Sequence, residues 1–152
     1  MKKNSFLNDI LQNTSCPQGK VYGMDLSEES VAFARRHNAG ELDRRCFIRQ
    51  GDVRSLPYGD GAFDAVTAFE TVYFWSPVGK ALAEVFRVIR KGGCFLISLE
   101  ASDPELGKAW TERIKGMAVY GAEELKRLLS QAGFSDIRVI QKKEELHIVA
   151  HK

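Results

Sequence analysis

Short apolar runs alternate with amphipathic stretches along most of the chain, and this alternation predicts strands separated by helices. Runs at residues 20–24, 47–50, 63–69 and 95–99 have the length of strands, and the run 63–69 has the nearly continuous apolar character of a parallel strand that is covered on both faces. Apolar residues recur with helical spacing over residues 28–37, 77–91 and 122–132, and also near the amino terminus, at Phe6, Leu7, Ile10 and Leu11. The pattern therefore predicts alternating strands and helices.

Turn and capping residues separate these elements. Ser27 is placed to cap the helix that follows the first strand, and Gly133 is placed to end the last helix. The runs 137–141 and 145–151 are joined through a three-residue polar connection, which suits an antiparallel hairpin. We expect an α/β fold with a mostly parallel sheet and an antiparallel carboxyl-terminal hairpin, formed as a single domain over residues 1–152.

Composition excludes several classes of protein. The chain has 152 residues, 44% hydrophobic and 28% charged, which is ordinary for a globular protein. A net charge of +2 without a long basic run gives no electrostatic reason to expect a nucleic acid partner. The three scattered cysteines indicate a reducing cytosol rather than a disulfide framework. We expect a cytoplasmic protein with no metal site, no signal peptide and no membrane-spanning segment.

The first predicted strand ends on an acid, Asp25, and a helix begins almost at once. In doubly wound α/β folds a carboxylate at the tip of a buried strand binds the two hydroxyls of a ribose. Asp25 could instead only help to cap the helix, and this stretch alone favours neither interpretation.

Four motifs occur in a fixed order along the chain. They are Asp25, then Gly51-Asp52-Val53, then Phe63-Asp64-Ala65-Val66, and finally Arg87-Val88-Ile89-Arg90-Lys91-Gly92-Gly93. Together they resemble the class I S-adenosylmethionine-dependent methyltransferases of the small-molecule type, from about Gly19 to the carboxyl terminus. The family commonly has Lys-Pro-Gly-Gly where this chain has Arg90-Lys91-Gly92-Gly93. The resemblance implies a Rossmann-like sheet, S-adenosylmethionine as cofactor and a small-molecule methyl acceptor.

The resemblance also implies roles for single residues. Asp25 would bind the ribose hydroxyls, with Leu26 against the adenine. Asp52 would accept from the adenine amino group, Val53 would offer a backbone N–H to the ring, and Glu70 would lie near the transferred methyl group. Asp52 could equally be a turn residue and Glu70 a solvated strand end. No residue stands out as a general base, so the catalytic residue stays unknown.

An aromatic stretch, Tyr73-Phe74-Trp75, follows the strand 63–69 and precedes a helix. Such residues could line the acceptor pocket, because aromatic faces attract a sulfonium cation and exclude water. They could also be core residues under a loop. Trp110 and Tyr120 are further candidates for this wall.

The family's glycine-rich turn has no counterpart in this sequence. It should lie roughly 20 residues before the ribose-binding acid, yet residues 1–18 contain no glycine and no strand-like run. We therefore expect that the first strand and the cofactor loop are missing, that two sheet edges are exposed, and that S-adenosylmethionine binds weakly. A homodimer through these edges is one expected consequence. Two alternatives remain: a non-catalytic remnant that binds a partner, and a nicotinamide-binding Rossmann oxidoreductase.

Overall fold

The computed structural model describes residues 18–143 and 145–152, which form two compact units. The first unit contains residues up to Asp52 and the second runs from Val53 to Lys152. The predicted helix around Phe6 and Leu7 lies outside the described residues. The division into two units does not test the prediction of a single domain, and each unit is described by itself.

The first unit is a parallel pair of strands with one helix. β1 (Val21–Asp25) pairs with β2 (Cys46–Gln50), and α2 (Glu28–His37) connects them. α2 begins at Ser27, whose side chain accepts a hydrogen bond from the backbone N–H of Ser30 at 3.2 Å, as predicted. In its described part, residues 18–52, the buried core consists of Val31, Cys46 and Ile48.

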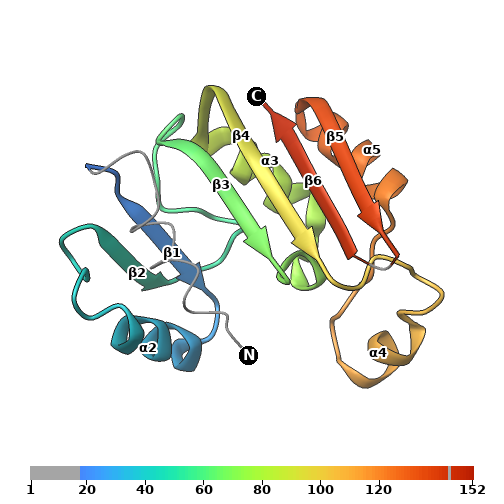
Figure 1. Cartoon of the computed structure of the whole chain (residues 1–152), viewed down its shortest axis with the longest axis horizontal. Coiled ribbons are helices and arrows are strands. Elements are labelled where there is room, and N and C mark those ends of the chain that lie inside the picture. Colours follow the sequence, from blue (N-terminus) through green and yellow to red (C-terminus); the bar gives the residue numbers. More distant parts are fainter. Residues whose placement is uncertain (1–17, 144) are drawn as a thin grey trace. The chain divides into compact units, whose positions relative to one another are not determined.

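The second unit is a four-stranded sheet in the order β3-β4-β6-β5. β3 (Phe63–Phe69) and β4 (Ile89–Leu99) are parallel, whereas β6 (Glu145–His151) is antiparallel to both β4 and β5 (Ser135–Lys142). The helices α3 (Val78–Val88) and α5 (Ala122–Ala132) lie on one face of this sheet (Figure 1). Two short helices, η1 (Val72–Phe74) and α4 (Lys108–Arg113), lie beyond the carboxyl ends of β3 and β4.

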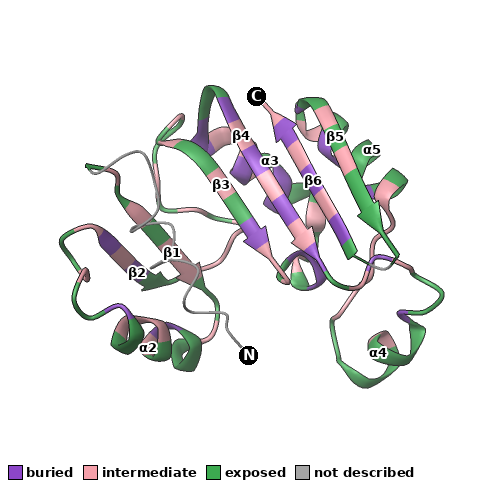
Figure 2. Cartoon of the chain, in the orientation of Figure 1, coloured by how far each residue is buried: buried purple, intermediate pink, exposed green. Residues whose placement is uncertain are grey.

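Alternation along the strands places the core under α3 and α5. In β4, Phe95, Ile97 and Leu99 are buried, and the residues between them are only partly buried (Figure 2). α3 and α5 contribute fully buried residues, among them Leu82, Val85, Leu125 and Leu129. The opposite face of the sheet is more exposed in the part of the chain that the structure describes.

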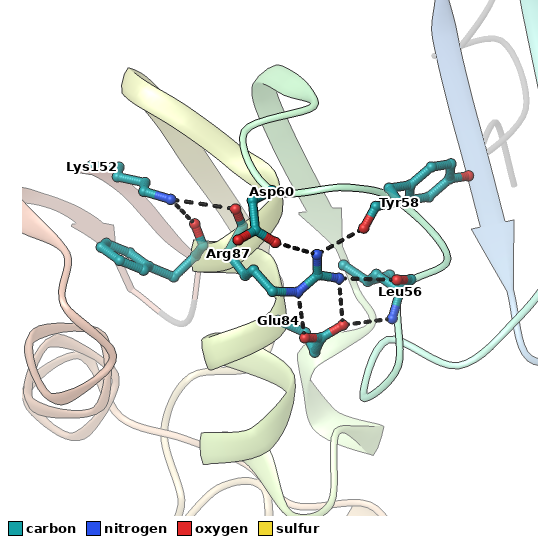
Figure 3. Close-up of polar contacts among 7 residues, drawn as sticks. Leu56, Tyr58, Asp60, Glu84, Arg87 and Lys152 are labelled. Atoms are coloured by element: carbon teal, nitrogen blue, oxygen red, sulfur yellow. Dashed lines mark hydrogen bonds and ion pairs between the residues drawn. The ribbon is translucent and has the colours of Figure 1, made fainter.

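A network around Arg87 fixes the loop that leads into β3 (Figure 3). The Arg87 guanidinium donates to the Glu84 carboxylate, to Asp60 and to the backbone carbonyls of Leu56 and Tyr58, over 2.7–3.0 Å. Glu84 in turn accepts from the backbone N–H of Leu56 at 2.8 Å. The hydrogen bond to Glu84 is the main cause that raises the pKa of Arg87, so the cation persists at any ordinary pH.

The end of α3 corrects one prediction. The helical spacing over residues 77–91 predicts a helix that includes Ile89, but α3 ends at Val88, and Ile89 already belongs to β4 and pairs with Phe63. Two hydrogen bonds join this stretch to Lys152, from Gly92 N to Lys152 O at 2.8 Å and from Lys152 N to Gly93 O at 3.0 Å. Pairing with distant residues therefore extends the strand through the glycines.

The predicted fold class is otherwise confirmed. The strands β1, β2 and β3 lie within a residue of the predicted runs, β4 begins six residues before its predicted start, and the terminal hairpin is antiparallel. Among the described residues, β1 pairs only with β2, and β3 pairs on one side only, with β4. That these edges of β1 and β3 are exposed stays a prediction for the chain as a whole, since residues 1–17 lie outside its described part.

Candidate cofactor and acceptor site

Asp25 and Asp52 lie at the same edge of the first unit. Asp25 ends β1, and Asp52 follows the end of the parallel strand β2 by two residues. The N–H of Gly51 donates to the carbonyl of Asp25 at 3.0 Å, which joins the two strand tips. A Cβ at Gly51 would collide with the Met24 side chain. The Gly-Asp motif thus has a packing reason as well as the role that the resemblance implies.

The Asp25 carboxylate keeps capacity for a ligand. Its Oδ1 atom accepts from the N–H of Ser27 at 2.8 Å, and Oδ2 accepts no hydrogen bond from the described residues. The next residue, Leu26, is 68% exposed, which is unusual for a large apolar side chain. An exposed carboxylate beside an exposed apolar side chain fits a ribose with an attached purine ring. Asp25 therefore caps the turn with one oxygen, as one of its two interpretations predicts, and its contact with a ribose stays a prediction.

Glu70, the residue predicted to lie near the transferred methyl group, is hydrogen-bonded to residues at the carboxyl end of β4. It follows β3 and has a positive φ of 55°. Its N–H donates to the carbonyl of Ser98 at 3.0 Å, and its carboxylate accepts from the N–H of Glu100 at 2.7 Å and from the Tyr73 hydroxyl at 3.3 Å. Glu70 therefore connects β3 to the end of β4, and its contact with the methyl group stays a prediction.

Tyr73 is a core residue rather than an open wall residue. It is 4% exposed, and its hydroxyl oxygen accepts from the N–H of Ala101 at 2.9 Å. Burial raises the pKa of Tyr73 to about 12. The phenol therefore stays protonated in the folded protein at neutral pH and donates to Glu70.

The other predicted wall residues differ from Tyr73. Phe74 is 52% exposed, whereas Trp75 is half-buried and stacks on Phe95, with ring centroids 6.1 Å apart. Val53 is half-buried against the core of the second unit. Tyr120 is also half-buried, and Trp110 is 54% exposed. Phe74 and Trp110 are thus the members of this set with open apolar surface.

Two features escaped the sequence argument. Ser98 Oγ and His147 Nδ1 lie 3.0 Å apart across the β4–β6 pair, although the residues are 49 positions apart. The backbone of Tyr73 also binds a distant segment, since its carbonyl accepts from the N–H of Ala118 at 2.8 Å. No local pattern predicts either contact, because both depend on how the strands assemble.

The described residues were also searched for a membrane-spanning helix and for a metal site. No described helix combines the length and the apolar character that crossing a membrane requires. Within the same residues, no three His, Cys, Asp or Glu side chains gather as a metal site would need.

Comparisons with known proteins agree with this geometry. Residues 5–97 match the methyltransferase domain family. The demethylmenaquinone methyltransferase of Symbiobacterium thermophilum is 37% identical over 89 residues, which are 58% of this chain and 35% of that protein. The fatty-acid O-methyltransferase of Mycolicibacterium smegmatis is 41% identical over 75 residues, which are 49% of this chain and 26% of that protein.

A solved structure supports the fold. The SAM-dependent methyltransferase of Thermotoga maritima superposes with a TM-score of 0.74 at 22% identity, over 86% of this chain and 72% of that one. The chain spans about a third of the length of the curated relatives it matches.

An acid-tipped parallel strand pair and a mixed sheet that ends in an antiparallel hairpin define the Rossmann-like methyltransferase class. The chain belongs to the methyltransferase domain family, whose match covers more than half of its residues. S-adenosylmethionine is the cofactor of this class, as predicted.

Proposed function

We propose that this chain is the part of an S-adenosylmethionine-dependent methyltransferase that binds the nucleoside end of the cofactor and a small-molecule acceptor. The observation that carries the proposal is the exposed Asp25 carboxylate, with an oxygen that accepts nothing from the described residues, beside the exposed Leu26. The family match and the named activities of the relatives support it.

In this proposal some residues bind the cofactor and others bind the acceptor. Asp25 accepts from the ribose hydroxyls, Leu26 covers one face of the adenine, and Asp52 and Val53 bind its edge. When bound, the cofactor supplies an electrophilic methyl group on a sulfonium. Glu70, Phe74 and Trp75 form the acceptor side, and the buried Tyr73 supports it by donating its hydroxyl to the Glu70 carboxylate. Catalysis comes mainly from holding two reactants in line, since the described site offers no evident general base.

A thermal-shift comparison tests the class of cofactor. S-adenosylhomocysteine should raise the melting temperature, because a ligand that binds only the folded state stabilises it by mass action. NADH at the same concentration should leave it unchanged. A shift with NADH alone would assign the chain to the oxidoreductases, and no shift with either at millimolar concentration would favour a non-catalytic partner-binding module.

The open strand edges support a second part of the proposal. β1 and β3 each pair on one side only among the described strands, and unpaired edges are templates for another strand. We therefore propose that the chain forms a homodimer through an edge, in the reducing cytosol that its cysteines suit. Light scattering over a hundredfold range of concentration tests this, and a monomer throughout contradicts it.

A further inference from the structure

The segment 102–117, which connects β4 to α5, is attached at both ends to one residue. Ala101, just before it, donates its N–H to the Tyr73 hydroxyl oxygen at 2.9 Å. Ala118, just after it, donates its N–H to the Tyr73 carbonyl at 2.8 Å. The segment therefore begins and ends beside the candidate acceptor wall, beyond the carboxyl ends of β3 and β4 (Figure 1).

The base of this segment is packed against the core. Ser102 is 2% exposed, and Gly107 is buried. A Cβ on Gly107 would lie 2.7 Å from Val119 Cγ2, so the chain approaches closely at this point. Met117 and Val119 pack against the core of the second unit. Hydrogen bonds at both ends and packing against the core therefore fix the position of the segment.

The tip of the segment presents apolar side chains to solvent. Leu106, Trp110 and Ile114 are 60%, 54% and 37% exposed. They occur every fourth residue, and helical hydrogen bonds run through the stretch, such as Ile114 N to Trp110 O at 2.8 Å. Residues four apart on helical turns lie on the same side. Exposed apolar residues that lie together on one side of an element often mark a binding surface, whereas single scattered ones are ordinary.

The charge of the segment selects the kind of ligand. It contains three acids and three bases: Asp103, Glu105, Glu112, Lys108, Arg113 and Lys115. With balanced charge, the surface offers no attraction for a nucleic acid or an anionic membrane. A neutral apolar group is the ligand that this composition favours.

We propose that Leu106, Trp110 and Ile114 bind the apolar chain or ring of the methyl acceptor and determine that the enzyme accepts lipophilic molecules. This inference rests on the proposed function, and it adds the substrate class. The two hydrogen bonds of Tyr73 to the ends of the segment connect the stripe to the acceptor side of the site. A relative that acts on fatty acids is consistent with it.

Tryptophan fluorescence tests the proposal directly, because the chain has only two tryptophans. Trp75→Phe leaves Trp110 as the single reporter. Titration with hexanoate, octanoate and decanoate, below their micelle concentrations, should shift its emission to the blue. Affinity should rise by about fourfold for each buried methylene. In the reverse variant, Trp110→Phe, the remaining Trp75 is half-buried and already stacked on Phe95, so its emission should shift less than that of Trp110.

Leu106→Ser supplies the mutational test, since Leu106 is exposed and its loss should leave folding intact. Decanoate binding should weaken by about tenfold or more. The matched control is Phe33→Ser, an exposed aromatic residue in the other unit, which should bind decanoate as the parent does.

Three results overturn the inference. They are no fluorescence shift with decanoate, equal affinity for hexanoate and decanoate, and response only to phosphatidylcholine vesicles, which would make the stripe a membrane contact. Calorimetry with S-adenosylhomocysteine on the same samples separates the two proposals. Cofactor binding without decanoate binding refutes the lipophilic acceptor alone, whereas decanoate binding without cofactor binding refutes the proposed function and the acceptor role of the stripe together.

Discussion

The two units present acids at their strand tips over very different cores. Among the described residues, the first unit buries three apolar residues in its core cluster and the second buries fifteen. Asp25, in the first unit, has one oxygen that accepts no hydrogen bond from the described residues, whereas Glu70, in the second, connects two strand ends. The same motif, an acid at the end of a parallel strand, thus keeps an oxygen without a described partner in the first unit and is hydrogen-bonded to neighbouring residues in the second.

This difference indicates where stability and ligand binding reside. A small core leaves little stabilisation from burial, so bound ligand should matter most for the first unit. The second unit is stabilised by its own packing, and its exposed Phe74 and Trp110 are the residues that we propose to contact an acceptor.

The largest expected effect comes from the core of the second unit. Phe95 is fully buried and stacks on Trp75, so Phe95→Ala should lower the free energy of unfolding by about 3–5 kcal/mol. Phe33→Ala, at an exposed position of the first unit, should change it by about 0.5 kcal/mol or less. Urea denaturation measures both. Equal losses would contradict the packing of Phe95 in the core of the second unit.

The buried phenol of Tyr73 gives a smaller, pH-dependent effect. Because burial raises its pKa to about 12, above the ordinary value near 10, its stabilisation is complete below pH 10. It should be lost as the pH rises toward 12, by about 1–3 kcal/mol. Urea denaturation at several pH values measures this loss. Tyr73→Phe should reduce the slope, and an unchanged slope would contradict the assignment.

Two glycines give the smallest effect. Gly133 ends α5 with φ 107°, and a Cβ there would lie 2.9 Å from the Phe86 ring, so Gly133→Ala should cost about 1–2 kcal/mol. Gly40→Ala, in the first unit, meets nothing within 4 Å and should be neutral within about 0.5 kcal/mol. Thermal unfolding compares them. A neutral Gly133→Ala would show that the second unit is less tightly packed than described.

The sequence predicted the fold better than the site. Short apolar runs predicted the strands, but β3 is less covered than its continuous run suggests, since Asp64, Ala65 and Thr67 are exposed. The start of β4 was misassigned because Ile89 is apolar on either a helix stripe or a strand, and only its pairing with Phe63 decides. Glycines 92 and 93 look like a stop, yet hydrogen bonds to Lys152 keep them in the strand.

The site residues were harder to predict from the sequence, because their burial and hydrogen bonds depend on residues that are distant in the chain. Tyr73 and Phe74 are neighbours in the sequence, but one is buried and the other is 52% exposed. Nothing local indicates that Tyr73 receives hydrogen bonds from Ala101 and Ala118. Asp25 was easier to interpret, since the strand, the acid and the helix cap are consecutive.

The central claim is that the Asp25 carboxylate binds the cofactor ribose. Isothermal titration with S-adenosylhomocysteine tests it, using Asp25→Asn, which keeps an oxygen for the Ser27 N–H, and Glu29→Gln, which removes one negative charge nearby in α2. Loss of a hydrogen bond to a charged group predicts binding about 10- to 100-fold weaker in Asp25→Asn and unchanged in Glu29→Gln. Equal affinity of Asp25→Asn and the parent chain would contradict the claim.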